Sequence, residues 1–181
     1  MGLADHLIPH LFALVRGSNL PTTLRTSSLS LLATIADTAD LALLPYTHDL
    51  ANAMLDLLQI EGTHVSTEAQ VQQQQQQPST DVNTNSPASM DSQPTATDTK
   101  FTPFRRASLH FLGMLVRAYT QRAYGSSDSG ANGSNVDDFP VRRTTTTLNY
   151  VAATDADAVV RVMAREVVDA VHTLERALVG L

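Results

Sequence analysis

The sequence contains no cysteine and no tryptophan. Without cysteine, the chain cannot form a disulfide, a thiolate zinc site or a cysteine nucleophile. No apolar run approaches the roughly 18 residues of a membrane span. The first residues also lack the basic cluster that precedes the apolar region of a secretory signal. These absences predict a cytoplasmic protein without membrane insertion.

Charged residues are few and unevenly distributed. The chain carries 12 basic and 18 acidic residues, for a net charge of -6. Residues 101–124 hold Arg105, Arg106, Arg117 and Arg122 and no acid. A nucleic-acid-binding domain usually shows a basic excess over a whole face, so nucleic acid is not the expected partner. The four arginines favour an acidic protein partner; alternatively, they are solvated or paired between helices.

Patterns typical of catalysis and metal binding are incomplete. His6 and His10 have the helical spacing of a metal-binding pair, but a proline lies between them and no nearby acid completes a site. His48 and Asp49 are neighbours in sequence only, because adjacent residues on a helix point apart. The glycine-rich residues 125–130 lack the lysine that follows a phosphate-binding loop. The sequence therefore predicts no enzyme activity, no cofactor and no metal site.

A short pattern occurs three times, at Leu24-Arg25, Phe104-Arg105 and Val160-Arg161. In each copy, a small residue follows the arginine by three positions and an aliphatic residue follows it by seven; these are Ser28 and Leu32, Ser108 and Leu112, and Ala164 and Val168. At about 3.6 residues per turn, the apolar, small and aliphatic positions share one helix face, with the arginine at its edge. The pattern indicates repeated packing helices rather than a reaction centre.

Helical patterns predict an all-α protein of about six helices in two groups. Residues 1–61 and residues 101–181 are each expected to form three helices. Between them, residues 62–100 are rich in Gln, Ser, Thr and Pro and are expected to be disordered. A glutamine run at 72–77 could instead extend a helix or mediate coiled-coil association. A flexible loop is expected at 125–138.

The expected helix bounds follow from apolar spacing and from capping residues. The helices are expected over residues 7–16 (or from Pro9), 21–39, 45–61, 102–124 and 140–153, with a last helix that starts at a capping box formed by residues 154–157.

Two helices carry specific packing expectations. The second helix is expected to bury a stripe formed by Leu24, Ser28, Leu31 and Ile35. The helix over 102–124 is apolar around most of its circumference, as a helix in the middle layer of a stack would be.

The spacing of the pattern predicts a repeat. The arginines lie 80 and 56 residues apart, and removing the two insertions leaves about 40 and 42. HEAT and armadillo units have 40 to 47 residues. We therefore expect a HEAT/armadillo-like α-solenoid, with an irregular helical bundle as the alternative.

Two sites resemble those of basophilic kinases. A basic pair precedes Ser108, but Ser108 occupies the small position of the repeat and is expected to be buried. Thr144 and Thr145 follow Arg142 and Arg143, are expected to be more exposed, and are the candidate phosphorylation sites.

Three segments resemble the C-terminal part of the RNA polymerase II assembly and nuclear import factor family, which is related to transport and Golgi organisation proteins of HEAT-repeat type. The segments are residues 24–32, residues 104–112 and residues 155–161. The resemblance implies a non-enzymatic scaffold that contacts polymerase subunits and nuclear transport machinery and shuttles from the cytoplasm to the nucleus. An adaptor in vesicle or Golgi transport is the alternative function.

The chain departs from that family in two respects. It is much shorter than a whole family member, and a long glutamine-rich insertion lies between its helices. A solenoid that started at the first helix would leave that helix without a cap. We therefore expect the chain to continue a longer solenoid.

Overall fold

The computed structural model describes residues 3–59, 96–125 and 139–179. Within these residues the chain is almost entirely helical and contains no β-strand, which confirms the all-α prediction. The labelled elements are α1 (Leu3–Arg16), α2 (Thr22–Thr38), α3 (Asp40–Leu43), the 3-10 turn η1 (Leu44–Tyr46), α5 (Ala96–Gly125), α6 (Val141–Thr154) and α7 (Ala158–Val179). A further helix over residues 47–59 continues directly from η1.

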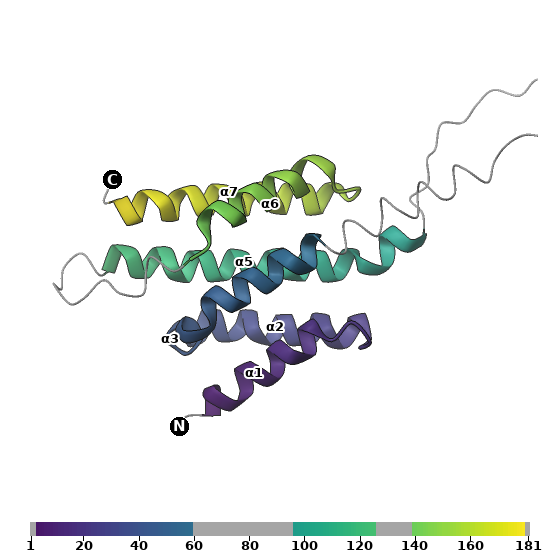
Figure 1. Ribbon diagram of the computed structural model, residues 1–181, viewed down its shortest axis with the longest axis horizontal. Coiled ribbons are helices and arrows are strands. Elements are labelled where there is room, and N and C mark those ends of the chain that lie inside the picture. Colours follow the sequence, from purple (N-terminus) through teal and green to yellow (C-terminus); the bar gives the residue numbers. More distant parts are fainter. Residues whose placement is uncertain (1–2, 60–95, 126–138, 180–181) are drawn as a thin grey trace, which may run out of the picture.

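The helices form two layers (Figure 1). In one layer, α2, α5 and α7 lie side by side and run in the same direction. In the other, α1, the 47–59 helix and α6 run in the opposite direction. The pair α1 and α2 lies at one end of the molecule, and the pair α6 and α7 lies at the other. Helix α5 therefore lies between two helix pairs.

The core consists of two apolar clusters that share the central helices. Phe104, Phe111 and Leu115 of α5 pack with side chains of α1 and α2. Leu109 and Leu112, also of α5, pack with side chains of α6 and α7. Helix α5 is thus apolar on two sides because each side faces a different helix pair, as its sequence predicted.

The small positions of the three patterns are buried, as predicted. Ser28, Ser108 and Ala164 are at most 2 % exposed. The Ser108 hydroxyl donates to the carbonyl of Phe104, 2.9 Å away, so it is shielded from solvent. At Gly113 of α5, an added Cβ would lie 3.4 Å from a methyl group of Val167, so α5 and α7 are in close contact at this point.

The stripe expected on α2 was wrong at Leu24 and Leu31, although Ser28 is buried and Ile35 is partly buried. Leu24 and Leu31 are 41 % and 54 % exposed, whereas Leu29 and Leu32 are fully buried. The apolar spacing of this helix fits two adjacent faces, and among the residues that the structure describes, only one of these faces has a neighbouring helix. The buried face also includes Arg25, which the sequence placed at its edge.

Two helices are longer at their starts than the sequence predicted. Helix α1 begins at Leu3 and includes Pro9, and α5 begins at Ala96 and includes Pro103. Residues 96–100 are therefore helical and not part of the expected insertion. A proline removes one backbone hydrogen bond, and in both helices buried side chains follow it and hold the turn in place. The expectations for residues 62–95 and 126–138 lie outside the described residues.

The cap of the last helix also differs from the prediction. Thr154 ends α6, and its hydroxyl donates to the carbonyl of Tyr150. Asp157 caps α7 instead, because its Oδ1 accepts the Val160 N–H at 2.8 Å. Asp155 Oδ1 accepts the Asp157 N–H at 2.9 Å, which fixes the turn between α6 and α7.

We expect truncation of the α5 core to cost far more than truncation of the surface. Phe111→Ala should lower the free energy of unfolding by about 3–5 kcal/mol, because it leaves a cavity between α5 and α2. Val162→Ala, at a half-exposed position on α7, should change it by less than about 0.5 kcal/mol. Urea unfolding followed by circular dichroism measures both, and equal losses would contradict this account of the core.

Candidate protein-binding surface

An open groove runs between α2 and α5 on the outer face of their layer. One hollow of about 640 Å³ is lined by Pro21, Thr22, Thr23, Thr26, Ser27 and Pro103. A second of about 450 Å³ is lined by Ser30, Ala33, Thr34, Asp37, His110 and Met114. We call these two hollows together the α2–α5 groove.

Hydroxyl groups dominate the α2 side of the groove. The side chains of Thr26, Ser30 and Thr34 each donate to the backbone carbonyl four residues earlier. Their hydroxyl protons are therefore engaged within the helix, as is usual for Ser and Thr in helix interiors. What this side offers a ligand is oxygen acceptors and threonine methyl groups.

A narrower hollow of about 50 Å³ lies between α5 and α7. His110 and Arg117 of α5 line it opposite Met163 and Glu166 of α7, beside Gly113. Because His110 also lines the α2–α5 groove, the two features form one continuous surface. We call it the α2–α5–α7 face, and its charges are of both signs.

The structure separates the four arginines that the sequence grouped as a partner-binding surface. Arg105 is 2 % exposed, and Arg106 is paired with an aspartate. Arg122 is half-buried, whereas Arg117 is exposed on the α2–α5–α7 face. The grouping was wrong for Arg105, which a partner cannot reach.

Arg105 is buried against Asp155 in the turn between α6 and α7. Its Nε lies 3.0 Å from Asp155 Oδ2, and its Nη2 donates to Oδ1 at 3.1 Å. The Asp155 side chain is 6 % exposed. Arg106 Nη2 donates to Asp157 Oδ2 at 2.7 Å, nearer the surface. Pairing between helices, the alternative left open by the sequence, thus accounts for both residues.

The other two arginines of the repeated pattern also bridge segments. Arg25 donates from Nε to the Val15 carbonyl at 3.0 Å, and its guanidinium lies 4.0 Å from the ring centre of Phe104. Arg161 donates to the carbonyls of Asp155 and Ala156. The expected position at the edge of the face holds for Arg161, which is half-buried, and was wrong for Arg25.

The two candidate phosphorylation sites are shielded in this structure. Thr144 is fully buried, and its hydroxyl donates to the Pro140 carbonyl at 2.8 Å. The Thr145 hydroxyl oxygen is also buried. The expected exposure was wrong for Thr144, because this part of α6 packs against the 47–59 helix and α7, whereas Thr145 is half-buried with its hydroxyl oxygen covered. A kinase could reach either residue only after α6 had opened.

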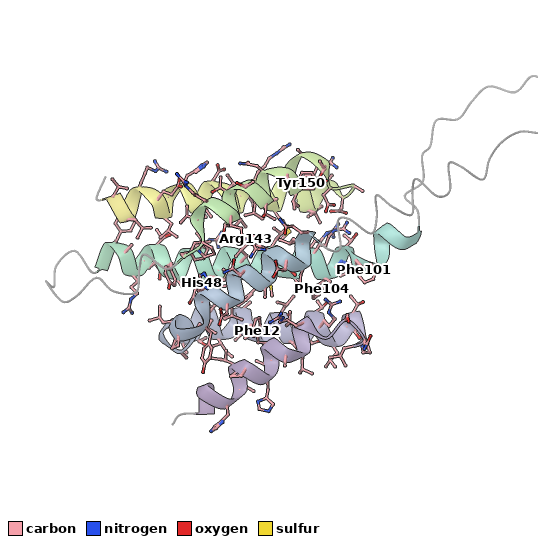
Figure 2. The ribbon with its side chains drawn as sticks, viewed as in Figure 1. Phe12, His48, Phe101, Phe104, Arg143 and Tyr150 are labelled. Carbon is pink, nitrogen blue, oxygen red and sulfur yellow. The ribbon has the colours of Figure 1, made fainter. Side chains whose placement is uncertain are left out.

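The basic residue beside those threonines serves as an interhelix contact. Arg143 donates to Asn52 Oδ1 at 2.6 Å and pairs with Asp56, both on the 47–59 helix (Figure 2). Gln59 donates to the Thr147 hydroxyl at 3.2 Å. These polar contacts connect two helices of one layer, and no pattern in the sequence indicates that the two helices are neighbours.

His10 and His48, which the sequence analysis singled out, make local contacts within their own helices. His10 Nδ1 lies 2.7 Å from the backbone carbonyl of His6. His48 Nδ1 lies 3.5 Å from Asp49 Oδ1, although the sequence predicted that these side chains point apart. Both are solvent-exposed, so the contact is weak. Among the described residues, no group of three metal-binding side chains occurs.

Comparisons with known proteins assign this chain to no family. No protein-family model, curated protein or solved structure matches this chain. In the part of the chain that the structure describes, no helix is long and apolar enough to cross a membrane. The glycine-rich residues 126–130 lie outside that part.

We expect the buried pair of Arg105 and Asp155 to be sensitive to loss of one charge. Asp155→Asn keeps an oxygen for the Asp157 N–H but leaves the Arg105 charge buried and uncompensated, so it should cost about 3–5 kcal/mol. The double variant Asp155→Asn with Arg105→Met should regain most of the lost stability, because it no longer buries an uncompensated charge. Urea unfolding of both variants tests this, and a double variant less stable than Asp155→Asn alone would contradict it.

Acid should weaken the cap of α7. Burial raises the pKa of Asp157, but the hydrogen bond and charge of Arg106 and the N–H groups of Val160 and Val159 lower it more, so the pKa lies below its ordinary value of 3.8. A lowered carboxyl pKa stabilises the fold above the ordinary pKa, and this contribution disappears as the pH falls through the lower value.

The unfolding temperature of the Asp157→Asn variant should therefore fall less steeply than that of the wild-type chain as the pH is lowered from about 4 to about 2. Near pH 6 it should be less stable by about 0.5–1 kcal/mol, because asparagine retains the cap but not the charge. Thermal unfolding across this pH range measures both effects. Identical pH profiles for the two proteins would contradict the stabilising role of the Asp157 charge.

Proposed function

We propose that this chain is a non-enzymatic α-solenoid scaffold of HEAT type that binds other proteins along the α2–α5–α7 face. Its units are α1 with α2, the 47–59 helix with α5, and α6 with α7. The observation that carries the proposal is that successive helix pairs lie in the same order and direction, with equivalent small residues buried in each (Figure 1). Stacked helix pairs of this kind create extended binding surfaces.

The chemistry of the face suits a protein segment. Threonine methyls and acceptor oxygens line one side, and Met114 and Met163 provide adaptable apolar contacts. Asp37, Arg117 and Glu166 supply charges of both signs. Since Arg105 and Arg106 are paired, a partner of mixed charge fits this face better than the acidic partner that the sequence suggested.

The partners we propose are RNA polymerase II subunits and nuclear transport machinery. Support comes from the resemblance of residues 24–32, 104–112 and 155–161 to the polymerase assembly and import family. The proposed role is to help the assembled polymerase reach the nucleus, with the chain moving between cytoplasm and nucleus. In a longer protein, the three helix pairs would form one part of the solenoid.

Arg117 provides the test of the binding face. Arg117→Glu reverses an exposed charge beside Glu166 and should reduce the recovery of polymerase subunits by at least about tenfold in a pull-down with the full chain. Arg142→Glu makes the same charge change at an exposed residue of the other layer and should leave recovery unchanged. Both variants should retain the wild-type circular dichroism spectrum.

Two results would refute parts of this proposal. Recovery of vesicle coat or tether proteins with no polymerase subunit would establish the transport adaptor instead. Equal recovery by wild type and Arg117→Glu would place the binding surface away from this face.

A further inference from the structure

The exposed leucines of α2 occupy positions that are buried in the other two helices of its layer. Aligned on the three pattern arginines, the positions one before and six after the arginine are Leu24 and Leu31 in α2, Phe104 and Phe111 in α5, and Val160 and Val167 in α7. In α2 these two side chains are 41 % and 54 % exposed, whereas in α5 and α7 all four are at most 6 % exposed.

In α5 and α7, the preceding helix of the layer covers these positions. Phe104, which is labelled in Figure 2, lies under the guanidinium of Arg25. Phe111 belongs to the cluster shared with α1 and α2. Val167 packs beside Gly113 of α5. The preceding helix of the layer therefore covers an apolar side chain at these positions in both cases, from α2 to α5 and from α5 to α7. On α2, the corresponding face has no such cover within the described residues.

The two ends of the stack differ in chemistry. At the α2 end, the exposed positions include two leucines with no charged residue on the helix surface between them. At the α7 end, Val159 and Val162 are also exposed, but charged residues, among them Arg165, Asp169 and Arg176, are exposed on the same helix. A charged outer surface suits the end of a helical stack, whereas exposed leucines at regular helical spacing indicate a surface that another element covers.

We infer that this surface, which we call the α2 end face (Leu24 and Leu31), docks a further antiparallel helix pair of the same repeat type. The pair packs on α2 as α2 packs on α5, and presents an arginine to Leu24 as Arg25 is presented to Phe104. The inference rests on the solenoid organisation proposed above. The occupant is inferred to be a helix pair because a helix pair covers the equivalent positions of α5.

The test extends the full chain at its N-terminus with a second copy of residues 3–46, which brings α1, α2 and their natural connection to the next helix. Linkage keeps the added pair at a high effective concentration near the α2 end face. Amide hydrogens of the added α2 should exchange at least about 100-fold more slowly than those of an unfolded chain. In the extended chain, Leu31→Asp in the original α2 should lower the unfolding temperature by at least about 4 °C.

The same substitution in the unextended chain is the first control, and it should shift the unfolding temperature by no more than about 1 °C. Val162→Asp is the second, because Val162 of α7 is 50 % exposed and lies away from the added pair. It should have equally small effects in both chains. An added pair that exchanges freely, or equal effects of Leu31→Asp in the two chains, would overturn the inference.

Two further measurements settle the remaining outcomes. If the extended chain aggregates, residues 3–46 are supplied as a separate peptide, and the absence of saturable binding sensitive to Leu31→Asp refutes docking. If the unextended chain forms a dimer in sedimentation equilibrium that Leu31→Asp dissociates, the occupant is a second copy and the inference is wrong. Capture of polymerase subunits is scored separately on the unextended chain, so failure of docking and failure of the proposed function are distinguishable.

Discussion

The burial of α5 on two sides is the constraint on which the rest of the structure depends. One side of this helix packs with α1 and α2 and the other with α6 and α7, so the two apolar clusters meet on a single element. The aromatic side chains Phe104 and Phe111 fill the first side, and Leu109 and Leu112 fill the second. Apolar burial of this kind is the main driving force of folding. It joins two halves of the chain that a long polar segment separates in sequence.

Two of the pattern arginines, Arg25 and Arg105, are buried beside this packing and add polar contacts to it. Arg25 contacts the end of α1 and the ring of Phe104, and Arg105 contacts the turn before α7. Each therefore joins its own helix to another segment of the stack. A buried ion pair contributes little net stability compared with apolar residues, but it strongly disfavours any arrangement in which one partner is left alone. We interpret the pair of Arg105 and Asp155 as a device that fixes how α5 and the turn before α7 fit together.

Because Arg105 is buried and Arg106 is paired with Asp157, the surface of α5 does not carry the group of four free arginines that the sequence suggested. The exposed chemistry of the α2–α5–α7 face is a mixture of hydroxyls, methionine and charges of both signs rather than a basic patch. Such a face is suited to recognising a particular protein segment through several weak contacts. The apolar α2 end face has a different character and a different proposed role, in which the stack is extended.

The sequence by itself determined the elements and much of the core. The helical class, the two-sided apolar character of α5 and the burial of Ser28, Ser108 and Ala164 follow from local periodicity, because a helix places residues three and four apart on one face. Only the tertiary structure decided which of two apolar faces of α2 is covered, that Asp155 neutralises Arg105 across 50 residues, and that Thr144 is buried. These depend on which helices become neighbours, and local spacing carries no information about contacts between segments far apart in the chain.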